Sequence, residues 1–235
     1  MTFGEPGPIE AVLFDFHSTL VDQGDPQVWL ELAWHRAGRD GSPSDQLGEQ
    51  GRNDLAGWVN RIWEHVREVD PDNERDLSPV RHREVYDELM ADVPAVDDDL
   101  AHALYECMLE TWIPYEDTVP VLTELRRRGV RIALVSNVGI DVRPVLEAGE
   151  LTDLFDAVVL SFEAESVKPA APIFERALSA VGAAPQNALM VGDSPHDDAG
   201  AALIGIRTLL LPRTSGTRHG LDLVLGLVPG TSPGH

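Results

Sequence analysis

Four short apolar segments of the chain lead into polar residues whose types could support chemistry together. These residues are Asp15, Ser136, Asn137, Lys168, Asp193, Asp197 and Asp198. Carboxylates that crowd together repel one another unless a cation neutralises them, and oxygen ligands favour a hard ion such as Mg²⁺. One carboxylate could then attack a phosphorus atom, while an ammonium, a hydroxyl and backbone N–H groups balance the charge on the phosphoryl oxygens. The set therefore predicts phosphoryl chemistry if the fold brings its members together.

The apolar segments have the length and composition of buried β-strands, and helical segments lie between them. We expect strands over residues 9–14, 130–135, 157–160, 188–191 and 206–211. We expect a helix over residues 118–128, capped by Asp117, and further helices that start at positions 141, 170 and 197. This alternation predicts an α/β fold with a doubly wound parallel sheet. Ligands of such sheets bind outside the carboxyl ends of the strands, which is where the polar residues fall.

A long segment separates the first expected strand from the second. It spans about 90 residues, far more than a crossover connection needs. We expect helices within it over residues 26–37, 55–69, 80–90 and 98–111, and all five tryptophans of the chain fall inside it. The tryptophans are expected to fill the core of a small helical bundle. The predicted organisation is an α/β core formed by residues 1–21 and 115–235, and an inserted helical domain over residues 22–114 that acts as a lid.

The composition limits the partners and the compartment. The formal net charge of −22 argues against binding a nucleic acid over any broad surface. No apolar run approaches the roughly 18 residues that a membrane span requires, and the first ten residues lack the features of a signal peptide. The single cysteine cannot form an intrachain disulfide, so we expect a cytoplasmic protein. The sequence makes no prediction of the oligomeric state.

Four motifs of the chain resemble those of the haloacid dehalogenase-like (HAD) hydrolases. The first is DFHSTLV at residues 15–21, where the family commonly has DxDxT followed by Leu or Val, and the second is Ser136 at the end of a strand. The third is KPAAPIF at residues 168–174, and the fourth is GDSPHDD at residues 192–198. They occur in the family's order over about residues 9–212. The long insertion after the first motif is where the family places a helical cap domain.

The resemblance implies a role for each polar residue. It makes Asp15 the nucleophile, and it implies that Asp15 and Asp193 bind Mg²⁺ through their side chains and His17 through its backbone carbonyl. The residues implied to hold the phosphoryl group are Ser136, Asn137 and Lys168. Those implied to support the site are Thr19, Asp197 and Asp198. The chain has only one lysine among its 18 basic residues, and that lysine is Lys168.

His17 is the departure from the family's pattern. Phosphatases of the family place an aspartate there, which protonates the leaving oxygen and then activates water. Phosphonoacetaldehyde hydrolases lack this aspartate but use a lysine of the cap, and residues 22–114 contain no lysine. Two alternatives stay open. One is a 2-haloacid dehalogenase, which would leave the acidic cluster without a use, and the other is a HAD-fold binding protein that has lost catalysis.

We therefore predict a Mg²⁺-dependent hydrolase of a small phosphorylated molecule that acts through an aspartyl-phosphate on Asp15. We expect His17 to act as the acid and base, since an imidazole can donate and accept a proton near neutral pH. Nothing in the helical segment predicts a particular substrate. Polar residues there such as Arg52 and Asn53 could reach one, although solvation is their more ordinary state.

Overall fold

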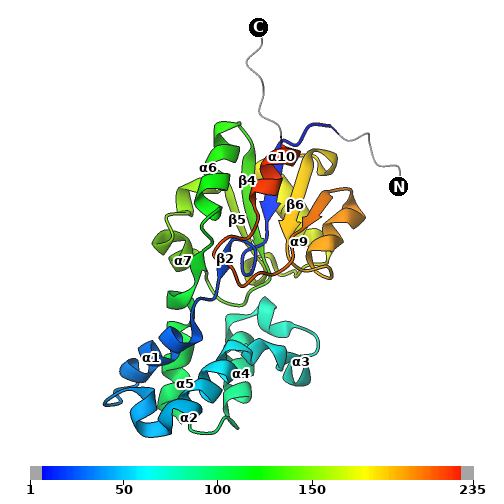
Figure 1. The fold of residues 1–235 in the computed structure, drawn as a ribbon. Coiled ribbons are helices and arrows are strands. Elements are labelled where there is room, and N and C mark those ends of the chain that lie inside the picture. Colours follow the sequence, from blue (N-terminus) through cyan, green and yellow to red (C-terminus); the bar gives the residue numbers. More distant parts are fainter. Residues whose placement is uncertain (1–6, 229–235) are drawn as a thin grey trace. The chain divides into compact units, whose positions relative to one another are not determined.

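The structure, a computed structural model, describes residues 7–228 (Figure 1). The chain divides into two compact units. One comprises the chain up to Asp22 together with the chain from Pro114 onward, and the other comprises Gln23–Ile113. The sequence places the corresponding boundaries at 21/22 and 114/115. Among the described residues, no helix combines the length and the apolar composition that a membrane crossing requires.

The first unit contains a five-stranded sheet in the order β5-β4-β1-β6-β7. Its strands are β1 (Ala11–Phe14), β4 (Arg131–Ser136), β5 (Ala157–Leu160), β6 (Ala188–Gly192) and β7 (Arg207–Leu210). Every neighbouring pair is parallel, and β1 lies in the centre between β4 and β6. Strands β1 and β6 are buried along their whole length, as expected for a sheet covered on both faces. The predicted fold class is confirmed.

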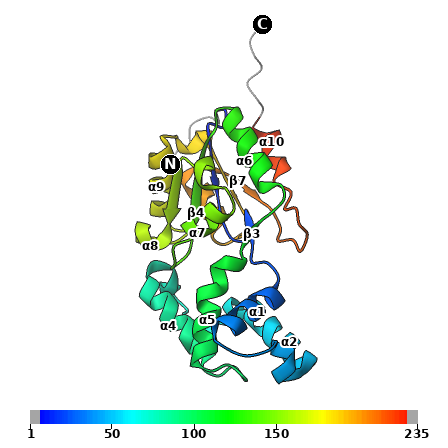
Figure 2. The same cartoon turned by 90° about the vertical axis from the view of Figure 1, so that its left-hand side faces the viewer.

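Helices cover both faces of this sheet (Figure 2). The helices of the first unit are α6 (Thr118–Arg127), α7 (Arg143–Ala148), α8 (Ser161–Ala164), α9 (Ala171–Val181) and α10 (Asp222–Leu227). Helix α9 packs on one face, where it forms an apolar core with side chains of the central strands such as Leu13 and Val135. Helices α6 and α10 lie on the other side of the sheet. Pro172 in its first turn and Gly182, at φ 64°, define the ends of α9.

The second unit is built from helices. They are α1 (Pro26–Arg36), α2 (Pro43–Asn60), η1 (Ile62–Glu64), α3 (Val66–Val69), η2 (Glu74–Leu77), α4 (Pro79–Met90), α5 (Asp98–Cys107) and η3 (Met108–Thr111). Trp29 and Trp34 are buried in this unit, whereas Trp58, Trp63 and Trp112 are half-buried. The Trp29 indole donates to the carbonyl of Leu104 at 2.8 Å, which ties α1 to α5. The tryptophans thus contribute unequally to the helical core.

The continuous helix expected over residues 55–69 is wrong. Helix α2 already begins at Pro43, behind the capping box of Ser42 and Asp45, and it is kinked at Gly48, where φ is 70°. It ends at Asn60, and the shorter helices η1 and α3 follow. The start was missed because residues 43–54 are mostly polar and carry no apolar period. The break was missed because no Gly or Pro marks it.

A two-stranded sheet also differs from the prediction. It pairs β2 (Val21–Asp22) with β3 (Ile113–Pro114), at the two points where the chain passes between the units. Strands of two residues are too short to produce an alternating pattern in the sequence, so the prediction contained neither of them.

His82 should make the stability of the helical unit depend on pH. Its ring is buried against Trp63 and shares a hydrogen bond of 2.9 Å with the Tyr105 hydroxyl. Burial, helped by the positive charge of Arg75, lowers the pKa of His82 from 6.5 to about 4. The folded state favours the neutral ring, so protonation of His82 opposes folding. The contribution of His82 to the free energy of unfolding is therefore fully present above pH 6.5 and is lost as the pH drops toward 4. The loss should reach about 3 kcal/mol.

The measurement is urea unfolding at several pH values, followed by tryptophan fluorescence. All five tryptophans lie in the helical unit, so the signal reports this unit. His82→Gln should lose less stability between pH 7 and pH 4.5 than the wild type, and the exposed His35, changed to Gln, should follow the wild type. Parallel losses in the wild type and His82→Gln would contradict the prediction.

Candidate active site

Asp15 directly follows the central strand β1 and points to the carboxyl edge of the sheet. Its backbone N–H donates to the carbonyl of Val191 at 2.9 Å, which extends the pairing of β1 with β6 by one residue. The carbonyl of Phe16 accepts from the backbone N–H groups of Leu20 and Val21, so the chain turns back at once. This turn brings the hydroxyl of Thr19 to 3.0 Å from Asp15 Oδ2, to which it donates. The loop thus fixes one oxygen of the carboxylate.

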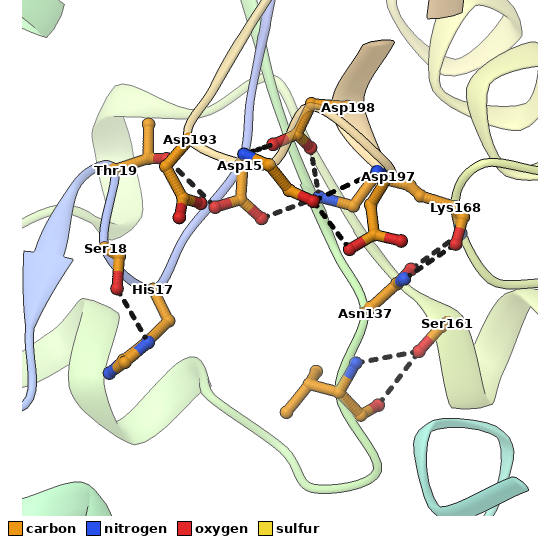
Figure 3. A network of polar contacts seen from close by, with 12 residues as sticks. Asp15, His17, Ser18, Thr19, Asn137, Ser161, Lys168, Asp193, Asp197 and Asp198 are labelled. Carbon is orange, nitrogen blue, oxygen red and sulfur yellow. Dashed lines mark hydrogen bonds and ion pairs between the residues drawn. The ribbon is translucent and has the colours of Figure 1, made fainter. Parts of the chain in front are cut away.

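Lys168 lies between two carboxylates (Figure 3). Its Nζ is 2.6 Å from Asp15 Oδ1 and 2.7 Å from Asp198 Oδ1. The side chains of Lys168 and Asp198 are 2% and 0% exposed, so solvent screens these pairs weakly. Burial alone would lower the pKa of the Lys168 ammonium, but the two carboxylates outweigh it and raise that pKa. Lys168 is therefore charged at neutral pH.

Asn137 positions the loop that carries Lys168. Its side-chain amide donates to the backbone carbonyl of Lys168 at 2.9 Å, and its side-chain oxygen accepts from the backbone N–H of Lys168 at 2.7 Å. Ser161 holds the backbone of Val138, the residue after Asn137, in a similar way. Its hydroxyl accepts from the backbone N–H of Val138 and lies within hydrogen-bond distance of the Val138 carbonyl. Ser136, the last residue of β4, is buried beside them. The amide of Asn137 is thus engaged by the protein's own backbone.

Asp198 rather than Asp197 joins the cluster. The helix expected from position 197 is a 3-10 helix, η6 (Asp198–Ile204). At its start the Asp198 carboxylate accepts from the backbone N–H of Ser194 at 2.9 Å, whereas Asp197 Oδ2 accepts from the Ser194 hydroxyl. Burial raises the pKa of Asp198 to about 6, although Lys168 opposes this shift. Asp197 also contacts the exposed His196, at 2.8 Å from its Nδ1.

Gly192 makes room for the Asp198 carboxylate. A methyl group on Gly192 would overlap Asp198, which is held by Lys168 and by the loop backbone. We expect Gly192→Ala to reduce the free energy of unfolding by about 1–3 kcal/mol, because the added carbon displaces a fully buried ion pair. Thermal unfolding followed by circular dichroism measures the effect. Gly226→Ala is the control, since a methyl group there meets nothing within 4 Å, and equal destabilisation by both changes would argue against the prediction.

Asp193 brings a third carboxylate to the site together with a partner that sequence reasoning missed. Its Oδ2 accepts from Nε of Arg213 at 2.5 Å. Burial and the nearby Asp15 raise the pKa of Asp193, while Arg213 opposes the rise. The sequence signal for Arg213 was weak, because it follows the last strand in a segment that matches none of the four motifs.

The three carboxylates fit a hard divalent cation. Oxygen atoms of Asp15, Asp193 and Asp198 lie within 4.8 Å of one another. Oxygen-only ligands with two or more negative charges are typical of Mg²⁺ sites. Each carboxylate also accepts hydrogen bonds from the protein. Asp15 accepts from Lys168 and Thr19, Asp198 accepts from Lys168 and from the backbone of Ser194, and one oxygen of Asp193 accepts from Arg213.

His17 lies next to the cluster but its ring is directed away from the carboxylate oxygens (Figure 3). Its Nδ1 is 3.2 Å from the hydroxyl of Ser18, a residue with a positive φ of 65°. Burial lowers the pKa of His17, an effect that Asp15 opposes and Arg213 strengthens. The neutral ring is therefore favoured at neutral pH.

Asp117 does not cap helix α6 as the sequence suggested. It occupies the position before the helix, but its buried carboxylate makes no bond to the first turn. Instead it accepts from the backbone N–H groups of His219, Gly220 and Leu221 at 2.8–3.0 Å. A carboxylate that satisfies three buried donors holds that segment firmly. The partners lie about 100 residues further along the chain, so no local pattern reveals them.

Comparison with known proteins supports the family and the fold. The family model of the haloacid dehalogenase-like hydrolases matches residues 9–205. The chain therefore belongs to this hydrolase family, as its four motifs predicted. The match ends before Arg213 and the segment that Asp117 holds.

Curated relatives are similar to parts of the chain. A phosphoserine phosphatase of Thermus thermophilus is 40% identical over 101 residues, which are 42% of this chain and 41% of the relative. The pyrophosphatase PpaX of Bacillus cereus is 35% identical over 98 residues, which are 40% of this chain and 44% of the relative. The chain thus spans less than half the length of these two relatives.

Solved structures share the fold over almost the whole chain. An HAD phosphatase from Thermococcus onnurineus has a TM-score of 0.64 at 22% identity, over 94% of this chain and 99% of that one. A 2-haloacid dehalogenase from Pseudomonas syringae has a TM-score of 0.60 at 24% identity, over 94% and 98%. YfnB from Bacillus subtilis, a HAD hydrolase solved with magnesium, has a TM-score of 0.67 at 15% identity, over 94% of this chain and 99% of that one. At these identities the likeness concerns the fold alone.

Proposed function

We propose that the protein is a Mg²⁺-dependent phosphomonoester hydrolase that acts on a small molecule through an aspartyl-phosphate on Asp15. The observation that carries this proposal is the buried Lys168 ammonium between Asp15 and Asp198, with Asp193 close enough to share a cation. Such a group stabilises the charge of phosphoryl oxygens beside a carboxylate nucleophile. The names of the partial relatives, a phosphoserine phosphatase and a pyrophosphatase, support the same class of substrate.

Asp15 provides the nucleophilic oxygen. One of its oxygens forms a bond to phosphorus while the bond from phosphorus to the ester oxygen breaks, and the departing alcohol takes up a proton. A water molecule then attacks the phosphorus of the aspartyl-phosphate, which releases inorganic phosphate and restores the carboxylate. Lys168 and Ser136 face the phosphoryl oxygens in this proposal. Thr19 orients Asp15 through the hydrogen bond to its second oxygen.

The residues that would hold Mg²⁺ are Asp15, Asp193 and the backbone carbonyl of His17, with Asp198 in support. The ion supplies positive charge that reduces the repulsion between the nucleophile and the phosphoryl group. Asn137 acts on the backbone of Lys168, so we propose that it positions the ammonium rather than binding the phosphoryl group. Asp197 supports the loop through Ser194. The helical unit is proposed to serve as the cap domain of the family.

The test is a panel of phosphate esters assayed for released phosphate with Mg²⁺ and with a chelator. We expect turnover that depends on Mg²⁺ and disappears with the chelator. The same preparations are assayed for chloride release from 2-haloacids, because several structures with this fold are dehalogenases. Chloride release that survives the chelator would replace the proposal by a dehalogenase, and absence of both activities would leave a binding protein.

We propose that His17 is the acid and base, a role that requires its ring to turn toward Asp15. If His17 protonates the leaving oxygen, His17→Ala should slow formation of the aspartyl-phosphate far more for an alkyl phosphate than for p-nitrophenyl phosphate. A nitrophenolate leaves without a proton, whereas an alkoxide does not. Single-turnover measurements isolate this step, because the same group would also activate water in the second step. Equal slowing with both substrates would show that His17 is not the acid.

A further inference from the structure

Arg213 lies at the rim of the candidate site, on a segment outside the four motifs. The backbone N–H of Leu211 donates to the carbonyl of Gly192 at 2.9 Å, which keeps the chain after β7 beside the end of β6. Asp193 is the next residue after β6, and Nε of Arg213 binds it. One nitrogen of Arg213 thus anchors it to Asp193, one of the three carboxylates that could hold a cation.

The rest of the Arg213 guanidinium is available. The side chain is 74% exposed, although the carboxylate that it binds is only 5% exposed. An arginine has five N–H groups, of which Nε carries one. The other four have no hydrogen-bond partner within residues 7–228. The Lys168 ammonium is buried and already forms ion pairs with the carboxylates of Asp15 and Asp198. Arg213 therefore offers a cationic group, unpaired at its terminal nitrogens within residues 7–228, that can meet a second charge on the substrate.

The segment that carries Arg213 is held in place beyond it. The Asp117 carboxylate binds three successive backbone N–H groups from His219 to Leu221, and the backbone N–H of Glu116 donates to the carbonyl of Thr217 at 2.8 Å. With Leu211 fixed to Gly192 at the other end, the segment is attached to the core unit on both sides of Arg213. A guanidinium held in this way loses less conformational freedom when it binds an anion.

We propose that Arg213 binds a second acidic group of the substrate, a carboxylate or another phosphate, while the phosphoryl group that is transferred lies at Asp15 and Lys168. This inference rests on the proposed function, since it names the class of substrate for the same site. A planar guanidinium with two free terminal nitrogens binds a carboxylate or phosphate through two parallel hydrogen bonds. The substrate is accordingly a small molecule with at least two acidic groups, rather than a neutral sugar or alcohol phosphate.

Binding of phosphonates tests this without turnover, because their carbon–phosphorus bond is not a phosphate ester. Titration calorimetry with Mg²⁺ compares two pairs of ligands. In the first pair, 2-amino-4-phosphonobutanoate carries a carboxylate that 3-aminopropylphosphonate lacks. In the second, methylenediphosphonate carries a second phosphonate that methylphosphonate lacks. The proteins are the wild type, Arg213→Gln and Arg218→Gln. Arg218 is a matched control, because it is exposed on the same segment and pairs with Asp222.

In at least one pair, the ligand with the second acidic group should bind about tenfold more tightly to the wild type and to Arg218→Gln. A gain in the first pair would identify the second group as a carboxylate, and a gain in the second pair would identify it as a phosphate. This gain should disappear in Arg213→Gln. No gain in either pair, a gain that survives Arg213→Gln, or no binding of any phosphonate would overturn the inference. Phosphate release from esters is measured separately. An Arg213-dependent gain without hydrolysis would refute the proposed function alone, and hydrolysis without the gain would refute this inference alone.

Discussion

Asp15→Asn should reduce the hydrolysis of phosphate esters to the background rate and leave the fold intact. An amide has the same shape as the carboxylate but cannot form an acyl-phosphate, so the loss should exceed about 10⁴-fold if the covalent path is the only one. The amide can still accept from Thr19, and one charge of the cluster is removed. Circular dichroism and thermal unfolding should therefore remain close to those of the wild type.

The control is Asp141→Asn. Asp141 is an exposed residue of the same unit whose carboxylate accepts from the backbone N–H of Arg143, a bond that asparagine can replace. Its turnover should equal that of the wild type. Acid-quenched wild-type protein should also carry labelled phosphate during turnover, and Asp15→Asn should carry none. Turnover near the wild-type rate in Asp15→Asn would remove the covalent mechanism.

Lys168→Arg should lower kcat/KM by about 10²–10³-fold, the range seen when one preorganised donor is lost from an active site. The Nζ atom lies within 2.7 Å of an oxygen of Asp15 and of Asp198 in a buried space. A guanidinium keeps the charge, but it is wider than an ammonium and would displace one of these carboxylates. The prediction therefore separates the geometry of the cation from its charge.

Lys168→Met provides the comparison, because it removes the charge at nearly the same volume. It leaves two buried carboxylates without their cation and should cost about 3–5 kcal/mol of stability. Thermal unfolding should thus order the proteins as wild type, Lys168→Arg and Lys168→Met, while activity separates the first from the other two. If Lys168→Arg retains more than a third of the wild-type kcat/KM, the ammonium has no special role.

The members of the cluster could be predicted because of where they fall along parallel strands. Asp15 and Asp193 each follow a buried strand, and β1 and β6 are neighbours, so their carboxylates must lie at one edge of the sheet. Lys168 was predictable from its motif and from being the only lysine. The strands themselves were predictable because short apolar segments between helical segments are typical of buried parallel strands.

Other parts depend on contacts that the sequence does not encode locally. Asp197 and Asp198 are neighbours with the same side chain, and a 3-10 turn decides which of them reaches Lys168. Asp117 and His219 are linked across 102 positions. Arg213 is one of 17 arginines, and only the pairing of β6 with β7 shows that it lies beside Asp193. These contacts depend on how the whole unit packs, which no local pattern of the sequence specifies.

The single lysine gives this protein a built-in spectroscopic reporter. A chain grown with ¹⁵N-labelled lysine carries the label in one side chain, and that side chain is the ammonium between Asp15 and Asp198. Its protons are shielded from bulk water, since the side chain is 2% exposed, and slow exchange makes such ammonium protons visible in nuclear magnetic resonance spectra. One signal would therefore follow the arrival of each ligand at the reacting carboxylate, with no assignment of the remaining residues.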